Sequence, residues 1–216
     1  MGKYYFDCLA TDFEHNCSYE NSPEPEHSDS FLTTLNHIIE WLDKVEYKGK
    51  VKSSDKHYRF SSNFYECLTD SLNKLGYVLA EEYFKGDLKD LLDVDLEGVF
   101  KTEKDFFVIE VKKSKKKSFW YDYVKFMSLI GLGIVDYGIL FVPRNYIHKG
   151  EVLDMFDKAR FYRSCLVEYA RADYNIINKI ALVGYTQHYY SGDAIKDIDA
   201  EAIMKIKDAA RQYLER

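Results

Sequence analysis

The feature that most constrains the fold is a pair of strand-like segments between Leu91 and Ser114, LLDVDLEGVFKTEKDFFVIEVKKS. The first segment alternates apolar and acidic residues, whereas the second, Phe106 to Val111, is a continuous apolar run that contains Glu110 and leads into a lysine. A short polar connection, Lys101 to Asp105, separates them and predicts a hairpin of antiparallel strands. This pairing is expected to bring acidic residues of the first segment close to Glu110.

Carboxylates at the rim of a sheet are costly to desolvate unless a cation meets them. We expect Asp95 and Glu110 to converge on Mg²⁺, which binds through one or two carboxylates, keeps several waters and contacts substrate phosphate oxygens. Glu110 and Lys112 lie two residues apart on one strand, so their side chains share a face. Lys112 is then predicted to lie beside the metal and to orient a water. This combination indicates cleavage of a phosphodiester.

Two short runs carry a resemblance to a known family. The residues DLEGV from Asp95, followed after a turn by VIEVK ending at Lys112, resemble the Asp and Glu-x-Lys core of the PD-(D/E)XK nuclease superfamily. The order of elements expected after this core, helix, strand, long helix and strand, is similar to that of BamHI/BglII-type restriction endonucleases. The resemblance covers roughly Asp93 to Tyr185. It implies an α/β fold with a restriction-endonuclease-like central mixed β-sheet flanked by α-helices.

The resemblance also implies roles for individual residues. It assigns Asp95, Glu110 and Lys112 as catalytic residues. Asp95, Glu110 and the main-chain carbonyl of Val111 would hold the metal, and Lys112 would position the attacking water. No proline precedes the aspartate as in the family's motif, and Asp93 stays an alternative first ligand. The expected cofactor is Mg²⁺, for which Mn²⁺ is expected to substitute.

An upstream glutamate is a further candidate ligand. Related nucleases often present such a residue from a helix, and Glu66 lies on a helix that Ser61 or Ser62 is predicted to cap and that ends at Leu75. The resemblance therefore makes Glu66 a candidate metal ligand. Glu81 and Glu82 are the alternatives.

Lysines follow directly on the predicted catalytic residue, although the chain carries a net charge of −6. Basic side chains neutralise phosphates, and this term supplies much of the affinity of nucleic-acid-binding proteins. The loop after the next predicted strand adds two polar candidates. The predicted DNA-binding residues are Lys113, Lys115, Lys116, Lys117, Arg144 and Asn145. The expected partner is double-stranded DNA.

The rest of the chain is expected to form one domain over residues 1–216, because 46% of its residues are hydrophobic and supply ample core. Residues 11–30 hold six acidic residues and two prolines, which predicts a loop or flexible segment. Residues 47–58 are polar and basic and are predicted to be a surface loop. No stretch approaches the roughly 20 uninterrupted apolar residues of a membrane helix, so we expect no membrane partner and a cytoplasmic location.

Hydrophobic periodicity predicts the other elements. The sequence predicts helices over residues 31–42, 118–132 and 151–172, strands over 136–143 and 179–186, a loop over 187–193 and a last amphipathic helix. Trp120 and Tyr121 are left over from the inner stripe of the helix that contains them. Two interpretations stay open for them: stacking on bases or against sugar and phosphate, or burial in the core, which is commoner for aromatic helix residues.

The function that these predictions favour is that of a type II restriction endonuclease. It would hydrolyse double-stranded DNA at a specific short site with Mg²⁺ and leave 5′-phosphate ends. One site per chain and two strands to cut favour a homodimer. Two alternatives stay open: a repair or phage-defence nuclease of the same superfamily without a fixed site, and a catalytically inactive DNA- or protein-binding module of the same fold.

Overall fold

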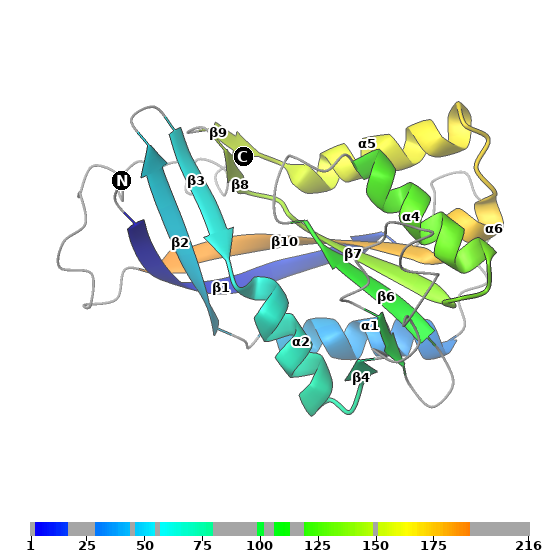
Figure 1. Ribbon diagram of the computed structural model, residues 1–216, viewed down its shortest axis with the longest axis horizontal. Coiled ribbons are helices and arrows are strands. Elements are labelled where there is room, and N and C mark those ends of the chain that lie inside the picture. The colour runs from blue at the N-terminus through cyan, green and yellow to red at the C-terminus, as the bar shows by residue number, and fades with distance from the viewer. Residues whose placement is uncertain are drawn as a thin grey trace, which may run out of the picture.

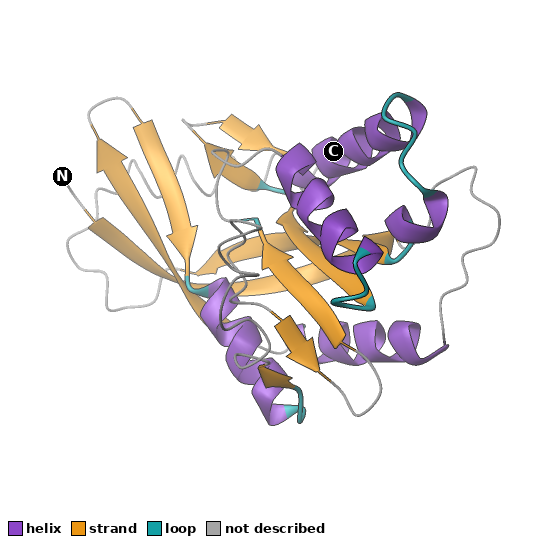
Figure 2. Cartoon of the chain, turned by 45° about the vertical axis from the view of Figure 1, so that its right-hand side comes forward, coloured by secondary structure: helices purple, strands orange, loops and turns teal. Residues whose placement is uncertain are grey.

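A mixed β-sheet with helices on both faces is the framework of the protein (Figures 1 and 2). The computed structural model describes residues 3–16, 29–43, 46–54, 57–79, 99–101, 106–112, 119–148 and 151–190. Within these ranges ten strands form one sheet and five helices pack against it. The predicted α/β architecture, a mixed sheet flanked by helices, is confirmed.

The centre of the sheet is parallel and its two wings are antiparallel. In spatial order the strands are β4 (Val78–Leu79), β5 (Val99–Lys101), β6 (Phe106–Val111), β7 (Tyr137–Pro143), β10 (Ile180–Tyr190), β1 (Lys3–Asn16), β2 (Glu46–Ser54), β3 (His57–Ser62), β8 (Tyr146–His148) and β9 (Glu151–Leu153). Strands β6, β7 and β10 run parallel to one another, and every other pair of neighbouring strands in this order is antiparallel. Parallel strands are normally covered on both faces, which fits their apolar sequences.

The helices form one layer on each face of these central strands (Figure 1). Their bounds are α1 Asp29–Leu42, α2 Phe64–Lys74, α4 Phe119–Gly131, α5 Met155–Glu168 and α6 Tyr174–Ile177. Helices α1 and α2 share one buried cluster with β6, β7 and β10, whereas α4, α5 and α6 share the other. The helix α4 follows β6 and precedes β7 in the chain. Its side chains contact Glu110 and Lys112 at the carboxyl end of β6.

Alternation along β6 decides which residues face α4. Phe107, Ile109 and Val111 belong to the cluster under α1 and α2, whereas Val108 belongs to the cluster under α4. Since side chains alternate with period 2, Glu110 continues the face of Val108 and is directed toward α4.

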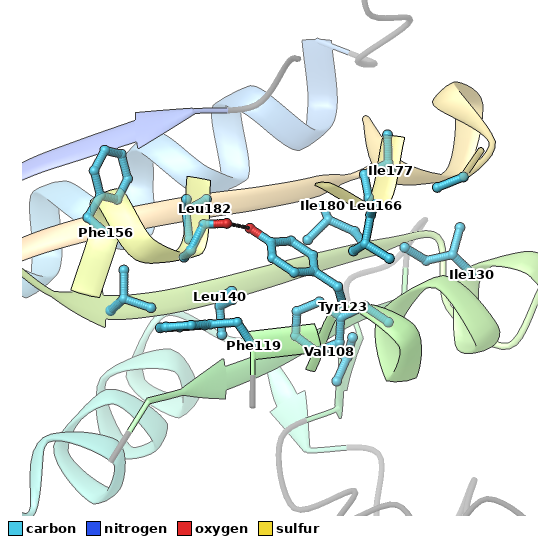
Figure 3. Close-up of a cluster of buried hydrophobic side chains, with 14 of the residues drawn as sticks. Val108, Phe119, Tyr123, Ile130, Leu140, Phe156, Leu166, Ile177, Ile180 and Leu182 are labelled. Atoms are coloured by element: carbon cyan, nitrogen blue, oxygen red, sulfur yellow. Dashed lines mark hydrogen bonds between the residues drawn. The ribbon is translucent and has the colours of Figure 1, made fainter. Parts of the chain in front are cut away.

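Tyr123 fixes α4 to its neighbour on the same face. Its ring is fully buried among apolar side chains from β6, β7 and β10, and its hydroxyl donates a hydrogen bond to the Ala159 carbonyl of α5 at 3.1 Å (Figure 3). Burial raises the pKa of the Tyr123 hydroxyl, so the group stays protonated and able to donate. The position of α4 over the sheet is therefore held by both packing and a specific hydrogen bond.

The sequence predicted most elements of the central layer. The hairpin of β5 and β6 is antiparallel, with Val99 opposite Val108, although residues 91–98 of its predicted first strand lie outside the described ranges. α1, α2, α4, β7 and β10 are present at their predicted places within a few residues, but α2 begins after Asn63, and Ser61 and Ser62, predicted to cap it, belong to β3. Gly76 ends α2 as predicted: its φ is +90°, and the Tyr77 and Gly76 amides donate to carbonyls of the last helical turn. Trp120 and Tyr121 are exposed, so they are not buried core residues.

Four predictions outside this layer are wrong. Residues 11–16 are not a loop but the end of β1, whose register against β10 shifts between Thr11 and Glu14. The expected surface loop 47–58 contains most of β2 and the start of β3, paired through their main chains. The expected helix 151–172 starts only at Met155, because residues 151–153 form the second strand of the β8–β9 hairpin. Residues 187–190, expected in a loop, continue β10.

Several other expectations concern residues outside the described ranges. They include residues 17–28 of the predicted loop or flexible segment and the last amphipathic helix. Among the helices that the structure does describe, none combines the length and the apolar character needed to cross a bilayer.

Candidate active site

Glu110 and Lys112 lie at the carboxyl end of β6, where this strand runs beside β7. The Lys112 amide donates to the Phe141 carbonyl at 2.9 Å, which extends the parallel ladder by one bond beyond β6. Both side chains contact residues of α4, so the prediction that they share one face of the strand is confirmed. The Glu-x-Lys motif is therefore placed between the end of the sheet and a helix.

The main-chain carbonyl of Val111 points away from β7, in the direction opposite to the Lys112 amide. It belongs to the same peptide unit as the Lys112 amide, and in a trans peptide the N–H and C=O groups point in opposite directions. The described chain has no cis peptide bond, and the amide points at β7. The Val111 carbonyl is therefore directed toward the β5 side of β6, away from β7.

Two ion pairs connect the motif to α4. Lys112 pairs with Asp122, and the Glu110 Oε2 atom accepts a hydrogen bond from Lys125 Nζ at 2.6 Å. Asp122 and Lys125 are three residues apart, so they lie on one face of the helix. We call Glu110, Lys112, Asp122 and Lys125 the charge cluster; its formal charges cancel.

The four members of the charge cluster differ in their access to solvent. The side chains of Lys112, Asp122 and Lys125 are at most 3% exposed, whereas that of Glu110 is 21% exposed. Burial lowers the pKa of the Lys112 ammonium and raises the pKa of the Asp122 carboxyl, and in each case the partner's charge opposes the shift. The Oδ1 atom of Asp122 has no hydrogen-bond partner among the described residues. Glu110 is thus the member best placed to meet a ligand from solution.

The donors at this strand end fit a hard cation of the Mg²⁺ type. Glu110 contributes a partly exposed carboxylate and Val111 a main-chain carbonyl, and Mg²⁺ needs only one or two carboxylates because it keeps several waters. Glu66 is exposed on α2, and no cluster of three acidic, histidine or cysteine ligands occurs within the described ranges. Asp95 and its alternative Asp93 lie outside these ranges.

Six further candidate metal ligands and phosphate contacts lie outside the described ranges. The residues concerned are Glu81, Glu82, Lys113, Lys115, Lys116 and Lys117. They stay predictions from the sequence.

The two predicted DNA contacts after β7 have structural partners. Arg144 donates to Glu14 at 2.7 Å and lies 3.9 Å from Asp154, so a phosphate would have to compete with carboxylates for it. Asn145 is buried, and its side-chain amide exchanges two hydrogen bonds with the main chain of Gln187 on β10. The Asn145 amide thus joins the turn after β7 to β10, and its role as a DNA contact stays a prediction.

Asp122 and Lys125 were not predicted as site residues from the sequence. A signal for them was present, because both fall at helical spacing with Phe119 and Leu129 on the buried stripe of α4. Charged residues on a buried stripe need partners of opposite charge. The Glu-x-Lys pair on the preceding strand offers one partner of each sign.

The chain matches no family model, no curated protein and no solved structure.

Proposed function

We propose that the protein is a Mg²⁺-dependent endonuclease that hydrolyses double-stranded DNA. The observation that supports this most is the arrangement at the end of β6. Glu110, a partly exposed carboxylate, shares a strand face with Lys112, and the Val111 carbonyl between them is directed away from β7, toward the β5 side of β6. Oxygen donors beside an ammonium of lowered pKa suit a site that binds a hard cation and aligns a water against a phosphodiester.

Each residue has a defined role in this proposal. Glu110, the Val111 carbonyl and Asp95 would hold the cation, which supplies charge stabilisation at the phosphoryl oxygens when bound. Lys112 would orient the attacking water. Asp122 is a positioning residue, because its ion pair holds the Lys112 ammonium at the end of the strand. Hydrolysis that releases the 3′ oxygen would leave 5′-phosphate ends.

A type II restriction enzyme is the specific form that we propose. A duplex presents two scissile phosphates and each chain has one Glu-x-Lys site, so a homodimer is the simplest assembly that cuts both strands. The lysines at positions 113 and 115–117 would contribute phosphate contacts next to this site.

Digestion of supercoiled plasmid DNA tests the proposal. We expect cleavage with Mg²⁺ or Mn²⁺, none with EDTA, and products that ligate without further phosphorylation because they carry 5′-phosphates. Discrete bands indicate a fixed recognition site, and a smear indicates a nuclease without one. Intact plasmid in both metals, across several DNA sequences, contradicts the proposal.

A specific observation favours a second candidate, a catalytically inactive binding module of the same fold. Glu110 and Lys112 each have an internal partner of opposite charge, an arrangement that a purely structural role would also produce. Lys112→Met, with folding checked by circular dichroism, separates the two. A nuclease loses cleavage and keeps DNA binding in Ca²⁺, whereas a binding module has no cleavage to lose.

A further inference from the structure

Lys125 occupies the position next to Glu110 where a cation is expected. Its side chain extends from α4 and is 2% exposed, and its Nζ lies 2.6 Å from the Glu110 Oε2 atom. The same Nζ is 5.8 Å from the centre of the Phe126 ring. The carboxylate that we propose as the metal ligand is therefore already neutralised by a buried ammonium.

A divalent cation and this ammonium compete for one carboxylate. Mg²⁺ binds a carboxylate oxygen directly at about 2.0–2.1 Å, so a metal on Oε2 would lie within about 5 Å of Nζ and would coincide with it if both met the same lone pair. Even on the second oxygen, the metal would share one carboxyl group with Nζ and would lie within about 7 Å of it, and two positive charges at that distance repel in a partly buried site. The lysine side chain is flexible and begins on a helix at the edge of the site, so it is the partner that can withdraw.

We propose that Lys125 is a built-in counterion of Glu110. Its ammonium group must leave the Glu110 carboxylate when a divalent cation binds there. In the metal-free protein it offsets the cost of a partly buried carboxylate. When metal binds, the Lys125 ammonium moves away and becomes accessible. Lys125 thus sets the metal affinity of the site. This inference rests on the proposed function at one point, the binding of a divalent cation at Glu110.

Binding of Mn²⁺, followed by the loss of the electron paramagnetic resonance signal of the free ion, tests the inference. Lys125→Met removes the charge and keeps the length of the side chain. We expect it to bind Mn²⁺ more tightly than the parent by about tenfold or more. Lys158→Met, at an exposed position on α5, changes the net charge by the same amount and is expected to leave the affinity unchanged.

The possible outcomes separate this inference from the proposed function. Glu110-dependent Mn²⁺ binding that Lys125→Met does not tighten overturns the inference alone. Tighter binding by Lys125→Met, without DNA cleavage by the parent, supports the inference and contradicts the nuclease. No Glu110-dependent binding in any variant overturns both.

A second measurement needs only the unaltered protein, and it decides the question if Lys125→Met does not fold. Amine-reactive labelling of Lys125, followed by peptide mass spectrometry, is expected to be slow without metal and faster with Mg²⁺. Lys158 should react equally under both conditions. Labelling of Lys125 that does not change with Mg²⁺ overturns the inference.

Discussion

At the residue scale, the charge cluster at the end of β6 controls how the candidate site is built. Glu110 and Lys112 were predicted from the sequence because a charged motif closed an apolar strand. Asp122 and Lys125 were not, because a strand–helix ion pair depends on how α4 crosses β6. That crossing is set by long-range packing such as the Tyr123–Ala159 hydrogen bond. Local periodicity places a residue on a face and leaves its partner open.

The Lys112–Asp122 pair provides a prediction about stability. Asp122→Ala leaves a buried ammonium without its counter-charge, so we expect a loss of about 3–5 kcal/mol in the free energy of unfolding. The double variant Lys112→Met with Asp122→Leu removes both charges and should unfold at close to the parent's urea concentration, since apolar replacement of a buried pair is often neutral. Urea denaturation of the parent and both variants measures this. A double variant as unstable as Asp122→Ala would show that the pair does more than neutralise buried charge.

At the element scale, the helix α4 packs closely on β7 because Gly138 of β7 has no side chain where the Phe126 ring of α4 lies. A Cβ atom added at Gly138 would lie 2.7 Å from the Phe126 ring, which is fully buried. We therefore expect Gly138→Ala to lower the free energy of unfolding by about 1–3 kcal/mol, as overpacking does. Gly131→Ala is the matched control: its Cβ meets only Ile176 at 3.4 Å at the end of α4, so it should be neutral or stabilising by up to about 1 kcal/mol.

Thermal unfolding of the two glycine variants measures this difference. Gly138→Ala at the parent's stability would mean that Phe126 can withdraw from β7 without cost. The packing of α4 would then not depend on this contact, and the position of Asp122 and Lys125 would need another explanation.

The same scale shows which elements sequence periodicity could predict. Helices α1, α2 and α4 bury apolar residues at helical spacing, and strands β6 and β7 are nearly continuous apolar runs; these elements and β10 were all predicted. Strand β2 was missed because its lysines at positions 48, 50 and 52 suggested a solvated loop, although they alternate with Tyr47, Gly49 and Val51. The β8–β9 hairpin was missed because its strands are three residues long, too short to show a period.

At the scale of the whole molecule, the central layer could be predicted from the sequence, whereas the full extent of the sheet could not. The order of β6, α4, β7, α5 and β10 follows from consecutive apolar segments. The antiparallel pairing of β1 with β10 joins residues such as Thr11 and Thr186, far apart in the chain, and no local pattern announces it. Because of this pairing β10, which would be the edge strand of the predicted sheet, lies in the middle of a larger sheet. The candidate site lies on the predicted half, which is why the motif could be located without it.

The most direct test of the central claim is the Mg²⁺-dependent cleavage rate of supercoiled plasmid DNA by Glu110→Gln. This change removes the charge of the proposed ligand and nearly keeps its shape. Removing a hydrogen-bond partner of a metal ligand already lowers metal affinity or activity by up to about a hundredfold. We therefore predict a larger loss of cleavage rate when the ligand itself is changed. Glu40→Gln, an exposed change on α1 at the opposite face of the sheet, should cleave like the parent. Cleavage by Glu110→Gln at the parent's rate would contradict the assignment of the site to the end of β6.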